Sequence, residues 1–474
     1  MKQMELNADF FRNTGSSSTK ELTQTVLLLS IPAILAEIST IAMTYIDAAM
    51  VGSLGANATA AIGVVSSTTW LIGGLCLCSG TGFSVQVAQL VGAGRLQNAR
   101  NVLRQSFSCL FLFALVLSGI SLAISKGLPV WLGGDPAICR EATNYFQVFA
   151  IGLLAGQFRN LAGSMLQCSG NMRTPSILNS AMCAFDVVFN WLLIFPGRQV
   201  RFLKWRIPVP GAGLGVAGAA WGTVLAQLVT ALVMLWFLCV RSEKMRIFGT
   251  VEKGKWRPEK NYVMTALRIG IPMAFENSIL CLAQIITTRI TTPLGTVAVA
   301  ANSLAVTAEG FCYMPGYGIS AASTTLVGQS IGAGRKDLAR KLARLSVYLG
   351  MALMTGTAAI MYFAAPALFH MLTPDPAVQE LGIRVLRIEC FAEPLFGASI
   401  VVTGAVRGAG DTLVPSILNL VSMWGVRITL AAFLASRLGL AGVWIAMCIE
   451  LWVRGLLFLV RLYRERWLQK ANII

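Results

Sequence analysis

The chain has 474 residues, of which 55% are hydrophobic and only 12% are charged. A soluble protein of this length needs more polar surface to cover its core, so the composition excludes an ordinary soluble domain. The net charge of +17 would suit nucleic acid, but Lys and Arg are concentrated in alternate loops between long apolar stretches. That distribution is typical of a membrane protein, and we expect a lipid bilayer rather than nucleic acid around the chain.

Twelve apolar stretches are long enough to cross a bilayer, which takes about 20 residues of helix. In chain order they cover residues 22–47, 57–90, 106–126, 143–166, 174–195, 213–240, 262–290, 296–330, 345–372, 382–405, 413–436 and 440–462. We therefore predict an all-α polytopic membrane protein with twelve transmembrane helices. The second and eighth stretches exceed the bilayer thickness, which predicts a tilt or a break. The candidate break points are Gly73, Gly74, Gly80 and Gly82 in one and Pro315, Gly316 and Gly318 in the other.

An internal repeat with an offset of 240 residues links the two halves of the chain. QLVGAGRLQNAR (89–100) matches QSIGAGRKDLAR (329–340) at seven of twelve positions. LQCSGNMRTPSILN (166–179) matches VRGAGDTLVPSILN (406–419) at six of fourteen positions. Ile31-Pro32 also recurs as Ile271-Pro272. Matches at one common offset indicate a duplicated unit rather than chance similarity.

Each repeat contains six predicted spans, so the second copy starts on the same side of the membrane as the first. The sequence therefore predicts two six-helix lobes related by a pseudo-two-fold axis along the membrane normal, with the substrate site between them. The predicted lobes are residues 1–240 and 262–474, and a basic cytoplasmic linker, residues 241–261, joins them.

The loop charges predict the orientation of the chain. Lys and Arg accumulate in the loops that lie inside if both termini are cytoplasmic. No cleavable signal peptide is evident in the polar first 21 residues. The exception is the basic outer loop near 196–212, which carries Arg198, Arg201, Lys204 and Arg206. We consider three alternatives for this insertion: a lid, a folded hairpin, or a segment without function that the translocation machinery tolerates.

Ionisable residues inside predicted spans are costly, so each one is a candidate for function. Asp47 and Asp186 have no evident partner in sequence, and Asp186 shares a helix face with Asn190 four residues later. Carboxylates here could take up a proton, and an oxygen-rich cavity could instead hold Na⁺. We predict a cation-coupling site at these three residues, against the alternative of a buried acid that only fixes helix packing.

Four further acids are candidates for binding substrate or a second ion. Glu276 follows Pro272, a proline that frees a backbone carbonyl near the carboxylate. Glu309 precedes the aromatic segment FCYMPGYG, and Glu389 and Glu393 lie in the tenth span. Glu450 and Arg454 are four residues apart on one helix face, and we expect them to neutralise each other in a structural role.

Motifs for an enzyme are missing from the sequence. The GAGR turns at 92–95 and 332–335 lack the GK[ST] ending of a P-loop, so we expect no ATP site. No clustered nucleophile, His-rich motif or Cys/His metal pattern is present, and the 11 cysteines lie mostly in apolar runs. We therefore expect no enzymatic activity and no cofactor, and any pumping must use an ion gradient.

Several motifs resemble those of the multidrug and toxic compound extrusion (MATE) transporters. They are IPAILAEISTIAMTYIDAAMVGSLG (31–55), the paired GAGR turns, GNMRTPSILN (170–179), RGAGDTLVPSILN (407–419) and EGFCYMPGYGISAASTTLVGQSIGAGR (309–335). The resemblance runs in order across nearly the whole chain. It implies twelve helices in two lobes around a central cavity, and exchange of Na⁺ or H⁺ for organic compounds.

The resemblance also implies roles for particular residues. Asp47 matches the first-helix acid that is tied to coupling in the family, and Pro32 matches a proline that bends that helix; Pro272 and Pro315 are further bending candidates. The fifth span departs from the family pattern, because Asp186 precedes Asn190 where relatives often have Asn before Asp. The cation site is therefore expected in altered geometry or lost.

These observations predict a secondary active antiporter of the plasma membrane, or of the inner membrane in a Gram-negative source. It would export cationic or amphipathic organic compounds in exchange for H⁺ or Na⁺ by alternating access, as a monomer. The alternative is a flippase for lipid-linked precursors, because proteins of related fold carry out that transport. The number of acids within the spans favours the antiporter.

Overall fold

The computed structural model describes residues 18–202, 205–249 and 254–470, most of which are helical. The N-terminal half contains the helices α2 (Thr19–Gly52), α3 (Ala56–Gly92), α4 (Leu96–Ile124), α5 (Leu128–Trp131), α6 (Pro136–Cys168), α7 (Arg173–Ile194) and α8 (Gly215–Trp236). A short π-helical segment, η1 (Phe237–Arg241), extends α8.

The C-terminal half begins with α9 (Lys260–Thr291), a 3₁₀ turn η2 (Thr292–Leu294), α10 (Thr296–Gly332) and α11 (Lys336–Leu372). It continues with α12 (Pro376–Cys390), α13 (Glu393–Gly408), α14 (Leu413–Ser422), the π-helical η3 (Met423–Ile428), α15 (Thr429–Leu438), α16 (Leu440–Tyr463) and α17 (Arg466–Lys470).

Ten helices in the described part of the chain are long and apolar enough to cross a membrane. The expected spans 143–166 and 382–405 are helical, as α6 and α12–α13, but are not among the ten. α12 and α13 are short because the helix is interrupted at Phe391 and Ala392. α6 packs on α3, α4 and α8, and α13 packs on α10, α11 and α16. Helices surrounded by other helices need less apolar surface than helices that face lipid.

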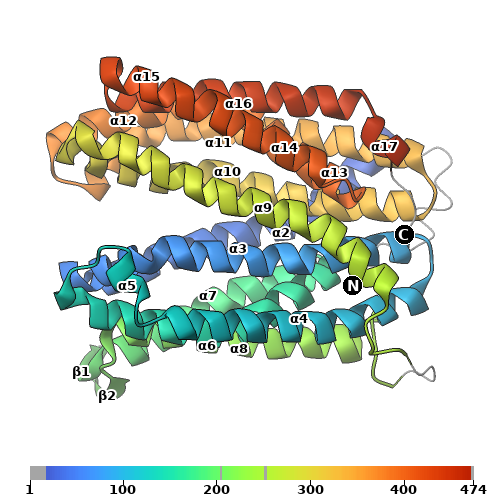
Figure 1. Cartoon of the computed structure of the whole chain (residues 1–474), viewed down its shortest axis with the longest axis horizontal. Helices are drawn as coiled ribbons and strands as arrows, with labels where there is room; N and C mark the ends of the chain where they lie inside the picture. The colour runs from blue at the N-terminus through green and yellow to red at the C-terminus, as the bar shows by residue number, and fades with distance from the viewer. Residues whose placement is uncertain (1–17, 203–204, 250–253, 471–474) are drawn as a thin grey trace.

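The two halves lie side by side (Figure 1), with α2–α8 in one group and α9–α17 in the other. The halves meet where α2 packs on α10 and α3 packs on α9, and α3 also contacts α10. These contacts pair the first helix of each half with the second helix of the other. The hairpin β1–β2 lies at the opposite end of the molecule from α17 (Figure 1).

Hydrogen bonds between the halves repeat at the spacing of the sequence repeat. Gln89 on α3 donates through Nε2 to the Gly408 carbonyl at 3.2 Å. Gln329 on α10, 240 residues later, donates to the Cys168 carbonyl at 2.7 Å. Gly408 is itself 240 residues after Cys168, so the two bonds are reciprocal. Both glutamines are buried, which makes each bond part of the packed contact between the halves.

Local sequence signals account for several helix starts, and they too recur. Ser18 and Glu21 form a reciprocal capping box at the start of α2. Asp135 caps α6 by accepting from the Ala137 N–H at 2.8 Å, with Pro136 in the first turn. Asp375 caps α12 in the same way at 2.9 Å, again before Pro and Ala.

Of the tilt or break expected in the two longest predicted spans, the break is wrong and the tilt stays a prediction. α3 and α10 are each 37 residues of unbroken helix, although α10 contains Pro315. The small residues serve close packing instead, because a Cβ at Gly82 would meet the Ala266 carbonyl and one at Gly318 would meet the Ile34 backbone.

The insertion after α7 is a folded hairpin, which was one of the three alternatives. β1 (Pro196–Phe202) pairs antiparallel with β2 (Trp205–Ala212), and the register shifts between Pro196 and Arg198. Lys204 lies outside the described residues, as does the polar lead-in of residues 1–17.

Candidate functional site

The predicted coupling residues Asp47, Asp186 and Asn190 lie together in the N-terminal half. Asp47 is on α2, and the other two are one turn apart on α7. The Asn190 amide nitrogen donates to Asp47 Oδ1 and to Asp186 Oδ2, both at 2.8 Å. One amide therefore links two carboxylates that are far apart in sequence.

This cluster has an excess of acceptors and negative charge. Asp186 and Asn190 have no exposed surface, and Asp186 Oδ1 and Asn190 Oδ1 have no hydrogen-bond partner. A neutral amide cannot balance two carboxylates, and buried charges need a partner. A proton or a Na⁺ ion, which prefers oxygen ligands as hard cations do, would supply the missing charge.

The reversed order of Asp186 and Asn190 still brings both side chains to Asp47. Residues four apart on a helix lie on one face, so exchanging the acid and the amide keeps both groups on that face. Of the two outcomes expected for this departure, the structure has an altered cluster in which the contact with Asp47 is present.

A glycine on α8 makes room for the Asn190 side chain. Gly222 packs against it so closely that an added Cβ would collide with Asn190 Oδ1. The sequence analysis did not single out Gly222, because only the packing of α7 on α8 shows its role. Tyr145 on α6 is also near, since the charges of Asp47 and Asp186 both act on its hydroxyl.

Glu276 on α9 is held in a separate buried cluster in the C-terminal half. Its carboxylate accepts from Ser416 Oγ and from Asn419 Nδ2, both at 2.6 Å. Arg407 Nη2 lies 3.5 Å from Glu276 Oε2 as an ion pair. The negative charge of Glu276 is therefore already balanced, and an organic cation would have to compete with Arg407.

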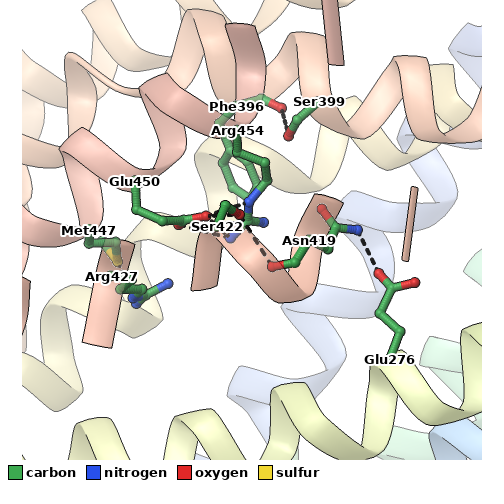
Figure 2. A network of polar contacts seen from close by, with 9 residues as sticks. All are labelled: Glu276, Phe396, Ser399, Asn419, Ser422, Arg427, Met447, Glu450 and Arg454. Atoms are coloured by element: carbon green, nitrogen blue, oxygen red, sulfur yellow. Dashed lines mark hydrogen bonds and ion pairs between the residues drawn. The ribbon is translucent and has the colours of Figure 1, made fainter. Parts of the chain in front are cut away.

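A chain of polar contacts extends from this cluster across α14 to α16 (Figure 2). Ser422 Oγ lies 3.2 Å from the Asn419 carbonyl and 2.6 Å from Glu450 Oε1. Arg454 binds Glu450 through Nε and Nη2 at 2.7 and 2.8 Å. Glu450 and Arg454 thus neutralise each other as predicted from their spacing.

Glu309, Glu389 and Glu393 are buried near one another in the C-terminal half. Their charges interact, and that of Arg427 acts on Glu309 and Glu389. Neither carboxylate oxygen of Glu389 or Glu393 has a hydrogen-bond partner. Within the described ranges, no group of three or more His, Cys, Asp or Glu is arranged to hold a metal ion.

The helix-bending candidates Pro32, Pro272 and Pro315 lie inside α2, α9 and α10. Each helix continues through its proline, whose missing N–H leaves one backbone carbonyl without its helical partner. Bending at these residues remains a prediction.

Sequence reasoning missed Arg407, Ser416 and Asn419 as partners of Glu276. A signal existed, because PSILN at 415–419 repeats PSILN at 175–179 and contains both the serine and the asparagine. All eleven cysteines are unpaired.

The chain is similar to a known protein family and to curated members of it. The family model MatE matches residues 32–192 and 272–433, one segment in each half. A probable multidrug resistance protein NorM of Thermotoga maritima is 25% identical over 95% of this chain and 94% of its own length. The multidrug resistance protein MdtK of Yersinia pestis is 25% identical over 94% of this chain and 96% of its own.

A solved structure has the same fold over the full length. It is a MOP superfamily transporter from Pyrococcus furiosus, with a TM-score of 0.86 and 19% identity over 98% of this chain and 99% of its own. The similarity therefore extends over both halves and is not limited to a shared segment.

Proposed function

The chain belongs to the MatE family, and we propose that it is a secondary active antiporter that exports cationic or amphipathic organic compounds. Membership of this family makes it a membrane transporter and not an enzyme. The names of its relatives NorM and MdtK as multidrug resistance proteins support multidrug efflux as its activity.

The observation that carries the antiport proposal is the Asp47–Asn190–Asp186 cluster. Two carboxylates share one amide there, and two oxygens lack partners. Binding of H⁺ or Na⁺ would neutralise this cluster, and its release would restore repulsion between α2 and α7. A cation thus favours one arrangement of these helices over another, which is what coupling by alternating access requires.

We further propose twelve transmembrane helices in two lobes, 1–240 and 262–474, related by a pseudo-two-fold axis along the membrane normal. The reciprocal bonds of Gln89 and Gln329 support this symmetry. The protein would act as a monomer in the plasma membrane, with both termini and the linker 241–261 in the cytoplasm. Glu276, Glu309, Glu389 and Glu393 would bind substrate or a second ion in the C-terminal lobe.

The alternative, a flippase for lipid-linked precursors, has less support. A flippase cavity would need several free basic residues for phosphate groups. Three internal arginines, Arg407, Arg454 and Arg461, are instead paired with acids.

The test uses purified protein in liposomes loaded with ethidium. A pH gradient and a Na⁺ gradient are imposed separately, and dye movement is followed by fluorescence. Asp47→Asn removes one carboxylate of the cluster with little change of shape, and Arg384→Gln, at an exposed position on α12, is the matched control.

We expect one gradient to drive dye flux, Asp47→Asn to abolish it and Arg384→Gln to retain it. Undiminished gradient-driven flux in folded Asp47→Asn protein would disprove the coupling role of Asp47. If folded protein moves no dye under either gradient while it translocates a labelled lipid-linked sugar, the flippase is correct.

A further inference from the structure

Arg159 is a cation inside the N-terminal half that contacts only neutral groups. It lies on α6, where Nη1 donates to Asn179 Oδ1 at 3.1 Å and Nη2 donates to Asn160 Oδ1 at 2.8 Å. These bonds use two of the five N–H donors of a guanidinium. The Nε group is buried and has no partner.

Three internal arginines of the C-terminal half have a different environment, whereas a fourth, Arg427, contacts Met447 and makes no ion pair in the described ranges. Arg407 pairs with Glu276, Arg454 with Glu450 and Arg461 with Asp411. Arg159 makes no such ion pair in the described part of the chain. Glu37 is the acid whose charge acts on it, from beyond ion-pair distance. A guanidinium that is partly withdrawn from water and has no carboxylate in contact is a favourable position for a bound anion.

An internal cavity of about 210 Å³ adjoins this guanidinium. Its polar wall includes Arg159, Gln157, Asn160 and Gln227, and Phe149 contributes to its apolar wall. Gln157 has no exposed surface, and its Oε1 has no hydrogen-bond partner. The cavity therefore combines apolar lining residues with a cation and an unsatisfied amide oxygen.

The size of the cavity limits what it holds. Sites that enclose whole drug-sized ligands measure roughly 300–1,000 Å³, so this one accommodates only part of such a molecule. A ring with an acidic group fits this description, with the ring against the apolar wall and the carboxylate on the guanidinium. Arg is well suited to that contact because its planar donors match a carboxylate in two-point geometry.

We propose that this cavity is a subsite for the carboxylate of amphipathic substrates, with Arg159 as the group that binds it. The inference rests on the proposed transport function and deepens it, because it names the residue that would bind an acidic group of the substrate. Tyr145 lines the cavity and also lies near Asp47 and Asp186. A bound acid would therefore be next to the coupling cluster, where its charge would influence occupancy by the coupling cation.

The test compares two dyes that differ in one group, rhodamine B and its ethyl ester. The acid has a carboxylate on its phenyl ring, and the ester has the same ring without that charge. The full-length protein is purified in detergent in chloride-poor buffer, and the dissociation constant of each dye is measured by fluorescence polarisation. The measured quantity is the ratio of the two constants, ester over acid. Dye uptake by micelles cancels when this ratio is compared between variants.

In the wild-type protein we expect the acid to bind about tenfold more tightly than the ester, as a charge-assisted two-point contact predicts. Arg159→Gln is expected to lower the ratio about tenfold. Arg159→Lys should give an intermediate ratio, because lysine keeps the positive charge but lacks the planar two-point donor geometry of the guanidinium. Arg384→Gln, which removes an exposed charge on α12, should give the wild-type ratio.

The inference is overturned if the wild-type protein does not prefer the acid, or if Arg159→Gln weakens both dyes equally. Equal weakening is the result of a purely structural role, in which Arg159 only connects α6 to α7 through Asn179. If Arg159→Gln does not fold, a wild-type ratio in Arg159→Lys overturns the inference. Ethidium antiport that persists beside any of these results leaves the proposed function intact, whereas failure of ethidium antiport concerns that function alone.

Discussion

Asn190 shows how one side chain can determine the chemistry of a site. Its amide nitrogen connects Asp47 on α2 to Asp186 on α7, and its own oxygen has no hydrogen-bond partner. The position of the amide depends in turn on Gly222 of the neighbouring helix α8. The geometry of the proposed coupling cluster therefore depends on a residue that has no side chain.

Gly222→Ala should reduce gradient-driven ethidium flux in proteoliposomes about tenfold or more. The added methyl would collide with Asn190 Oδ1, and overpacking typically costs about 1–3 kcal/mol, enough to displace the amide from the two carboxylates. Gly119→Ala on α4 is the matched control, because an added Cβ there meets no atom within 4 Å. Equal flux in the two variants would show that the contact does not position Asn190.

Glu450→Ala should lower the stability of the protein by about 3–5 kcal/mol, because it leaves Arg454 desolvated without its ion pair. The Glu450 side chain is fully buried and that of Arg454 is 12% exposed. Thermal unfolding in detergent measures the change. Replacing both residues together, Glu450→Leu with Arg454→Leu, should cost much less. A double variant as unstable as Glu450→Ala would mean that packing, not charge, explains the loss.

At the scale of elements, small residues allow the long helices of the two halves to touch. A Cβ added to Gly92 at the end of α3 would meet the Gln329 carbonyl, and one added to Gly332 at the end of α10 would meet the Gln89 carbonyl. The two positions are 240 residues apart, as are the two glutamines. The same contact is therefore made twice, once from each half.

Gly92→Ala and Gly332→Ala should each lower the unfolding temperature, and by similar amounts. Each forces apart two helix ends whose backbones are in contact, and such overpacking costs about 1–3 kcal/mol. Gly356→Ala on α11 is the control, since nothing lies within 4 Å of its added Cβ. A large effect at only one of the two positions would show that the halves are not energetically equivalent here.

At the scale of the whole molecule, the distribution of the net charge of +17 between the two membrane-facing ends predicts how the chain is oriented. The cluster Arg335, Lys336, Arg340, Lys341 and Arg344 follows α10, near the end of the molecule that carries α17. Arg340 and Arg344 both bind Glu465 at 2.8 Å, which ties this basic segment to the loop after α16. The positive-inside rule predicts that this end lies in the cytoplasm.

A topology experiment checks this orientation. Green fluorescent protein fused after the last residue should fluoresce, and alkaline phosphatase fused after Gly133, between α5 and α6, should be active. Green fluorescent protein becomes fluorescent only in the cytoplasm, and alkaline phosphatase becomes active only outside it. Dark fluorescent fusions together with an inactive phosphatase fusion would indicate the opposite orientation.

The sequence by itself determined the membrane class, the duplicated plan and the family. Helices that cross hydrocarbon must be apolar over about 20 residues, so their existence can be read from composition along the chain. The offset of 240 residues and the PSILN and GAGR motifs record the duplication directly. The pairing of Glu450 with Arg454 was also predictable, because it depends on the geometry of a single helix.

Only the tertiary structure decided which buried groups meet. Asp47 and Asn190 are 143 residues apart, as are Glu276 and Asn419, and no local pattern connects them. The tertiary packing also gave Glu276 a charge partner, Arg407, and left α3 and α10 unbroken where a tilt or a break was expected. A glycine that allows close packing and one that interrupts a helix are identical in sequence, and only the neighbouring backbone distinguishes them.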